Sequence, residues 1–106
     1  MARIGETLEA LIEVIASRRG GDPARSWSAR LIADPALAAR KLAEEAVETA
    51  LAAVQGQRAA VVTESADLIY HWLALLAALD IDPDEVAQAL RSREGRSGVE
   101  EKAGRR

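Results

Sequence analysis

Residues 41–71 read KLAEEAVETALAAVQGQRAAVVTESADLIYH, and the fold can be worked out from this segment. Strong helix formers such as Ala, Leu, Glu and Lys fill it on both sides of a short turn at residues 55–57. Because so short a connection returns the chain antiparallel, the segment predicts a helical hairpin. We expect its first helix over residues 34–54 and its second over residues 58–79.

Helices are also predicted on either side of this hairpin. Leu and Ile recur at spacings of three and four over residues 4–17, which is the period of an amphipathic helix. Paired glycines and a proline at residues 20–23 end that helix, and residues 25–33 fit either a loop or a short helix. After the hairpin, a capping Asp followed by Pro at residues 82–83 opens a helix that ends near Arg93. We therefore predict an all-α protein, a four-helix bundle.

The composition indicates a single globular domain over residues 1–106. Hydrophobic residues make up 49% of the chain but aromatic residues only 3%, so the core consists of small side chains, and we expect pairing of subunits to complete the bundle. The net charge of −3 argues against a nucleic-acid partner. The absence of cysteine excludes disulfides and thiolate metal sites. Residues 93–106 are polar and rich in glycine, and we expect a flexible tail there.

The chain shows no pattern of secretion or membrane insertion. Its first residues lack the basic-then-apolar sequence of a signal peptide. The most apolar run, residues 66–79, contains Asp67 and His71 and is too short to span a bilayer. We expect a cytoplasmic protein without a membrane partner.

Acidic side chains occupy both helices of the predicted hairpin. Glu45 and Glu48 are three residues apart on the first helix, as are Glu64 and Asp67 on the second, so each pair shares one face. Counted from Gly56, Glu48 and Glu64 lie eight residues away on either side, and Glu45 and Asp67 lie eleven. On antiparallel helices each of these pairs sits at matching height. If the two faces meet, four carboxylates converge as ligands for a hard divalent cation such as Mg²⁺.

The alternative interpretation of these acids is a solvated surface stripe. On the first helix they share a polar stripe with Lys41 and Gln55, and most such stripes simply face water. The second helix argues against this, because residues 64–79 are apolar in nearly every direction apart from Glu64 and Asp67. A helix of that kind is buried, and buried carboxylates are paired or bind metal. We therefore predict a metal site.

Two neighbouring residues allow a structural or a functional role. His71 follows Asp67 by four residues and either packs in the core or reaches the site and its substrate. Lys41 precedes Glu45 by four and either forms a salt bridge with it or contacts a phosphate.

Several motifs together resemble a known family. Glu-Glu-x-x-Glu at residues 44–48, a hairpin, and Glu-x-x-Asp at residues 64–67 resemble the signature of the MazG-like all-α nucleoside triphosphate pyrophosphohydrolases. Within that superfamily, further segments resemble the phosphoribosyl-ATP pyrophosphohydrolase family. These segments are residues 8–12 with the arginines at 18–19, residues 22–31, residues 66–71 and residues 93–102. The likeness therefore covers essentially the whole chain. One departure is Trp27, where the family more often has Tyr.

The resemblance implies hydrolysis of phosphoribosyl-ATP to phosphoribosyl-AMP and pyrophosphate, the second step of histidine biosynthesis. It implies a homodimer or larger assembly, with Mg²⁺ held by Glu45, Glu48, Glu64 and Asp67. A metal would neutralise the triphosphate and acidify the attacking water. Either Glu44 or Glu45 would then accept the proton. The cations that we consider for contacts with the phosphates, besides Lys41 and His71, are Arg25, Arg30, Arg93, Arg96 and Lys102.

Two other functions fit the acidic motifs alone. The first is a MazG-like pyrophosphohydrolase of a different nucleoside or deoxynucleoside triphosphate, against which residues 22–31 and the tail argue. The second is a non-catalytic helical dimerisation module, which predicts that Glu64 and Asp67 lie on exposed faces.

Overall fold

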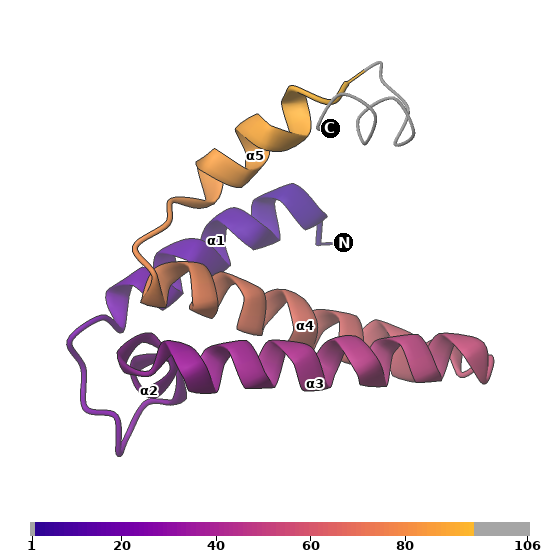
Figure 1. Cartoon of the computed structure of the whole chain (residues 1–106), viewed down its shortest axis with the longest axis horizontal. Helices are drawn as coiled ribbons and strands as arrows, with labels where there is room; N and C mark the ends of the chain where they lie inside the picture. The colour runs from indigo at the N-terminus through magenta and orange to yellow at the C-terminus, as the bar shows by residue number, and fades with distance from the viewer. Residues whose placement is uncertain (1, 95–106) are drawn as a thin grey trace, which may run out of the picture.

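The computed structural model describes residues 2–94 of the chain, and these residues form five helices without a strand (Figure 1). The predicted all-α class is confirmed. Residues that the sequence left open between loop and short helix form α2, which adds a fifth helix to the expected four. The helices in chain order are α1 (Ile4–Ser17), α2 (Trp27–Ala33), α3 (Pro35–Val54), α4 (Arg58–Ala78) and α5 (Pro83–Arg91).

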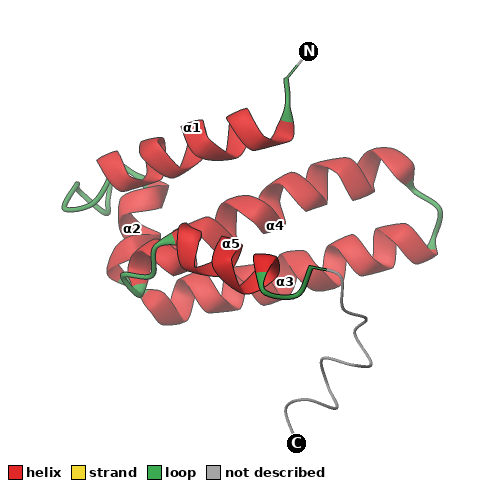
Figure 2. Ribbon diagram, turned by 90° about the horizontal axis from the view of Figure 1, so that it is seen from above, coloured by secondary structure: helices red, strands yellow, loops and turns green. Residues whose placement is uncertain are grey.

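The predicted hairpin is the long antiparallel pair α3 and α4, which lie side by side in both ribbon views (Figures 1 and 2). Asp34 caps α3 by accepting a hydrogen bond from the Leu37 N–H at 3.2 Å. The turn needs Gly56, whose φ of +69° lies in the left-handed region that glycine adopts without strain. The Gln57 N–H then bonds the Ala52 carbonyl at 2.9 Å, which ends α3 in a Schellman motif.

The core is built from small side chains where α2, α3 and α4 meet. Leu31, Ala38 and Ala74 are fully buried against one another, one residue from each helix. Ala38 and Ala74 are each eighteen residues from Gly56, so they face each other at matching height in the hairpin. A second cluster joins Ile15 of α1 to Ile32 and Leu73. This low-volume core agrees with the scarcity of aromatic residues in the sequence.

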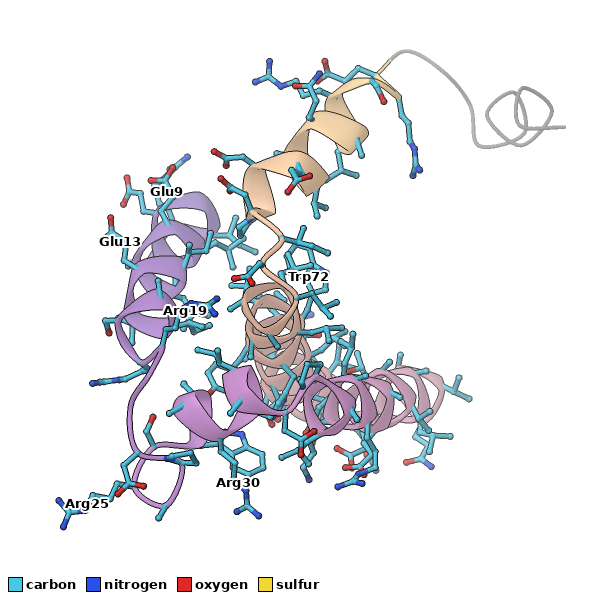
Figure 3. All side chains as sticks on the ribbon, turned by 60° about the vertical axis from the view of Figure 1, so that its left-hand side comes forward. Glu9, Glu13, Arg19, Arg25, Arg30 and Trp72 are labelled. Carbon is cyan, nitrogen blue, oxygen red and sulfur yellow. The ribbon has the colours of Figure 1, made fainter. Side chains whose placement is uncertain are left out.

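The far end of α4 is shaped by Asp80, which has a φ of +56°, a conformation uncommon outside glycine. The Ile81 N–H bonds the Leu76 carbonyl at 2.9 Å, so α4 also ends in a Schellman motif. Arg19, in the turn after α1, reaches this end of α4 (Figure 3). It pairs with the Asp80 carboxylate at 3.3 Å and donates to the Ala77 carbonyl.

Helix α5 projects away from the other helices and contains no buried residue (Figure 1). Its start is fixed by a capping box, in which Asp82 and Glu85 each accept a backbone hydrogen bond. Among the helices of residues 2–94, none combines the length and the apolar composition of a membrane span.

Candidate metal and phosphate site

Three of the four predicted carboxylates meet between α3 and α4. One oxygen each of Glu45, Glu48 and Glu64 lies within 4.8 Å of the other two. Glu45 and Glu48 stand on one face of α3 because they are three residues apart, and the register of the hairpin brings Glu64 to the same height. Carboxylate oxygens at this spacing can enter the coordination sphere of one hard cation.

Asp67 lies outside this cluster of three and is exposed. Its charge is nevertheless close enough to contribute to the raised pKa of Glu64. Glu64 itself is only half-buried. The sequence predicted burial all around this helix, but α1, α2 and α3 cover only part of the circumference of α4.

The cluster lacks donors for its acceptor atoms. One carboxylate oxygen of Glu45 and one of Glu64 have no exposed surface and no hydrogen-bond partner. Such atoms lose the hydrogen bonds of water without replacement, which is rare in a stable fold. A cation between these oxygens would replace the lost interactions, so the carboxylate oxygens present here are suitable ligands for a divalent ion.

The carboxylates also alter one another's protonation. The ionised carboxylates make no hydrogen bond to one another, but a proton on Glu64 can be shared with Glu45, and this is the main reason that the pKa of Glu64 is raised. Burial and the charges of Glu45 and Asp67 raise it further. The pKa of Glu48 is raised mainly because a proton on this group can be shared with Glu64, and also by the charge of the Glu64 carboxylate. Without a metal, the three groups therefore compete for protons.

Lys41 lies beside the cluster but pairs with the neighbouring Glu44. Its Nζ is 3.2 Å from a Glu44 oxygen. The sequence had suggested the next residue, Glu45, as the partner of this lysine. Arg40 approaches the same Glu44 carboxylate at 4.0 Å. Glu44 is therefore an exposed acid between two cations, and it does not belong to the cluster of three.

The predicted arginines lie in different places. The Arg30 guanidinium lies over the Trp27 ring, 5.8 Å from its centroid, and has no carboxylate partner among the described residues. Arg25 pairs with Asp22 at 3.9 Å in the loop before α2, where it points away from the helices (Figure 3). Arg93 follows α5. The remaining two predicted cations, Arg96 and Lys102, lie outside the described residues.

His71 is buried, and both of its ring nitrogens have partners in the chain. The Trp27 indole N–H donates to Nε2 at 3.2 Å. Because Nε2 accepts, Nδ1 carries the proton of the neutral ring and donates it to the Asp67 carbonyl at 2.9 Å. In this arrangement His71 joins α2 to α4 and has no free nitrogen for a substrate.

Trp27 is the site residue whose position the sequence did not reveal. The sequence showed it as an apolar anchor in an ambiguous segment, but its partner His71 is 44 residues away, and no local periodicity reports so distant a contact. The ring also has a second cation beside it, because the Lys41 Nζ lies 5.9 Å from its centroid.

Comparisons with known proteins identify relatives over nearly the full chain. The family model of phosphoribosyl-ATP pyrophosphohydrolase matches residues 8–94. A phosphoribosyl-ATP pyrophosphatase of a Caulobacter species is 55% identical over 105 residues, which cover 99% of this chain and 98% of that protein. The protein of the same name from Parvibaculum lavamentivorans is 54% identical over 106 residues, 99% of this chain and 97% of the relative. A third, from Paracoccus denitrificans, is 50% identical over 100 residues and 93% of each chain.

The matched region contains the entire hairpin, the carboxylate cluster and the Trp27–His71 contact. With such identity over nearly the full length of both partners, the chain belongs to the phosphoribosyl-ATP pyrophosphohydrolase family.

Proposed function

We propose that this chain hydrolyses phosphoribosyl-ATP to phosphoribosyl-AMP and pyrophosphate, the second step of histidine biosynthesis, in the cytoplasm. Family membership and the name shared by its relatives support the substrate. The structural observation that carries the proposal is the convergence of Glu45, Glu48 and Glu64, two of them with buried oxygens that have no donor.

We propose that these three carboxylates hold Mg²⁺ and that Asp67, one turn beyond Glu64, completes the set. A divalent cation bound here would neutralise charge on the triphosphate and lower the pKa of the attacking water. The exposure of Glu48 and Asp67 leaves this side of α3 and α4 open to solvent, as a site that admits a nucleotide requires.

The proton of the attacking water needs an acceptor, and Glu44 and Glu45 are the candidates. Glu45 belongs to the carboxylate cluster, whereas Glu44 lies outside it and pairs with Lys41. Loss of a metal ligand weakens metal affinity, whereas loss of a pure base lowers kcat only. Mg²⁺ titrations of Glu44→Gln and Glu45→Gln therefore separate the two roles.

Cations near the cluster would bind the phosphates of the substrate. Lys41 is one turn of α3 before Glu45, and Lys41 and Arg30 lie 5.9 and 5.8 Å from the centroid of the Trp27 ring. Both cations could therefore bind phosphate groups of the substrate that extend beyond the metal ligands. Arg93, Arg96 and Lys102 remain candidates for the same substrate; Arg25 is paired at a distance from the hairpin.

We further propose that a second copy of the chain covers the exposed apolar face of α3 and α4. Val47, Leu51, Val54 and Val62 are all more than half exposed on these helices. Large apolar patches on a soluble protein usually mark an interface. A groove of about 290 Å³ lies on the same helix pair, lined by Leu42, Leu68, Ile69 and Trp72. Sedimentation should give at least twice the protomer mass of 11.3 kDa.

One assay tests the proposed function against its rivals. Pyrophosphate release is measured from phosphoribosyl-ATP and from a panel of ribo- and deoxyribonucleoside triphosphates, with Mg²⁺ and with EDTA. We expect metal-dependent turnover with a clear preference for phosphoribosyl-ATP. Preference for another triphosphate would assign the chain a different substrate, and absence of turnover on all of them would favour a non-catalytic helical module.

A further inference from the structure

Trp27 combines an exposed ring with a fixed orientation. It is the first residue of α2, and it is 40% exposed. Its indole N–H donates to the buried His71, whose ring meets it edge-on at a centroid distance of 6.3 Å. His71 is held in turn by the Asp67 carbonyl of α4. The exposed indole is thus anchored to the helix that carries Glu64.

Two cations from different helices converge on this ring. The Arg30 guanidinium of α2 lies over it at 5.8 Å and the Lys41 ammonium of α3 at 5.9 Å from the centroid. Aromatic faces attract cations at such distances through their quadrupole. Lys41 is also paired with Glu44, whereas Arg30 has no carboxylate partner among the described residues. A phosphate that contacted both cations would therefore balance a charge that the chain itself leaves unbalanced.

We propose that Trp27 is a positioning residue, whose anchored ring holds Arg30 and Lys41 as one binding site for a phosphate group of the nucleotide. The inference rests on the proposed function and adds a residue to it. Arg30 is available for an anion because it has no carboxylate partner among residues 2–94. Lys41 is one turn from Glu45, so this phosphate site adjoins the carboxylate cluster. A polyphosphate can therefore reach both the metal ligands and these cations.

The positions of the cations favour a phosphate over the purine base. A base that stacked on a face of Trp27 covered by Arg30 or Lys41 would have to displace that cation. A phosphate needs no such displacement and gains charge-assisted hydrogen bonds from both. Stacking of the base is the rival outcome in the experiments below.

A neighbouring contact supplies a matched control. Ser28 follows Trp27, and its hydroxyl bonds the Tyr70 hydroxyl at 2.6 Å, so adjacent residues of α2 bind adjacent residues of α4. Ser28→Ala removes this second connection between the helices without touching the ring or the cations. Any effect that comes merely from loosening α2 should appear in Ser28→Ala as well.

The first experiment measures steady-state kinetics of pyrophosphate release. Trp27→Leu should raise KM about tenfold, the loss expected for one charge-assisted contact, with kcat within twofold of the parent. Trp27→Phe, which keeps a ring but loses the indole N–H, should raise KM less, and Ser28→Ala should leave KM within twofold. The double variant Trp27→Leu/Arg30→Gln should be no worse than the worse single variant, because the two residues act as a unit. An unchanged KM in Trp27→Leu, or the same increase in Ser28→Ala, would overturn the proposal.

The second experiment measures binding without turnover. Trp72→Phe leaves Trp27 as the single tryptophan, whose fluorescence is titrated without divalent cations against inorganic tripolyphosphate and against adenosine. We expect a saturable change with tripolyphosphate, its loss in Arg30→Gln and no change with adenosine. Saturation by adenosine alone would assign the ring to the base, and no response to tripolyphosphate would remove the phosphate site.

The two experiments also separate this inference from the function on which it rests. A parent protein that leaves phosphoribosyl-ATP intact but binds tripolyphosphate through Arg30 would refute the substrate and keep the anion site. A parent that turns over phosphoribosyl-ATP with an unchanged KM in both Trp27 variants would keep the substrate and refute the positioning role.

Discussion

Helix α4 carries two polar regions that differ in how their hydrogen bonds are satisfied. Toward the Gly56 turn, Glu64 meets Glu45 and Glu48, and two oxygens of this group are buried without a donor. Toward its middle, His71 is more deeply buried, yet both of its nitrogens have partners within the chain. The comparison teaches that burial alone does not mark a ligand site. The unsatisfied region is the one that needs a ligand, and the satisfied region holds the helices together.

The largest expected effect comes from the unsatisfied region. Glu48→Gln removes a charge and a proposed metal ligand while it keeps the shape of the side chain, so kcat for pyrophosphate release should fall about a hundredfold or more. Far-ultraviolet circular dichroism should remain helical. Glu13→Gln, on the outer side of α1 (Figure 3), is the control and should keep parental kinetics. Turnover of Glu48→Gln near the parental rate would contradict the assigned site.

The next effect is the stabilisation that we expect Mg²⁺ to bring to the folded protein. Binding at a hundredfold excess over Kd stabilises the fold by about 2.7 kcal/mol, or roughly 10–20 °C in Tm for a domain of this size. Glu64→Gln should lose most of this shift, as measured by thermal melts with millimolar Mg²⁺ and with EDTA. Asp67→Asn tests whether the fourth carboxylate belongs to the set. If it keeps the whole parental shift, Asp67 is not a ligand.

The satisfied region should respond in the opposite way. His71→Phe keeps a ring in the core but leaves the Trp27 N–H without its acceptor, which should cost about 1–3 kcal/mol and lower Tm by roughly 5–15 °C. The Mg²⁺-induced shift should persist in full, since no carboxylate is changed. A variant that lost this shift while keeping its Tm would show that His71 serves the metal site.

The smallest effect is the pH dependence of the metal-free fold. The pKa values of Glu48 and Glu64 are raised in the folded state, so the fold binds more protons than the unfolded chain above the ordinary value of 4.5. By linkage, the unfolding free energy then falls as pH rises from that value through the raised pKa values. In EDTA, Tm should therefore decline over this range, and the decline should be shallower in Glu64→Gln. Equal slopes of Tm against pH in the parent and in Glu64→Gln would mean that the carboxylates of the cluster do not raise one another's pKa values.

The sequence was sufficient to predict the helix ends, the turn and the hairpin register, because short stretches of neighbouring residues determine them. The bounds of α3 and the start of α5 followed from a capping Asp and a Pro, and the turn followed from Gly56. The meeting of Glu48 with Glu64 followed from counting along two regular helices, which needs no knowledge of side-chain packing.

Contacts between distant segments could not be predicted in this way. Helix α2 has only seven residues, too few for a periodic signal, and its formation depends on packing against α3 and α4. The preference of Lys41 for Glu44 over Glu45 is a choice of rotamer that spacing cannot decide. The exposure of Asp67 depends on how much of α4 is covered, which is a property of the assembled helices.

The alanine pair in the core also limits how this protein can change. Ala38 and Ala74 are fully buried in one cluster, at the same height in the hairpin, so their methyl groups set the distance between α3 and α4. The carboxylates project from these same helices farther along, and their separation depends on that distance. A larger residue at either alanine would push the two helices apart and would change the distances between the proposed metal ligands without replacing any of them. The geometry of the proposed metal site therefore depends partly on the smallest side chains of the core.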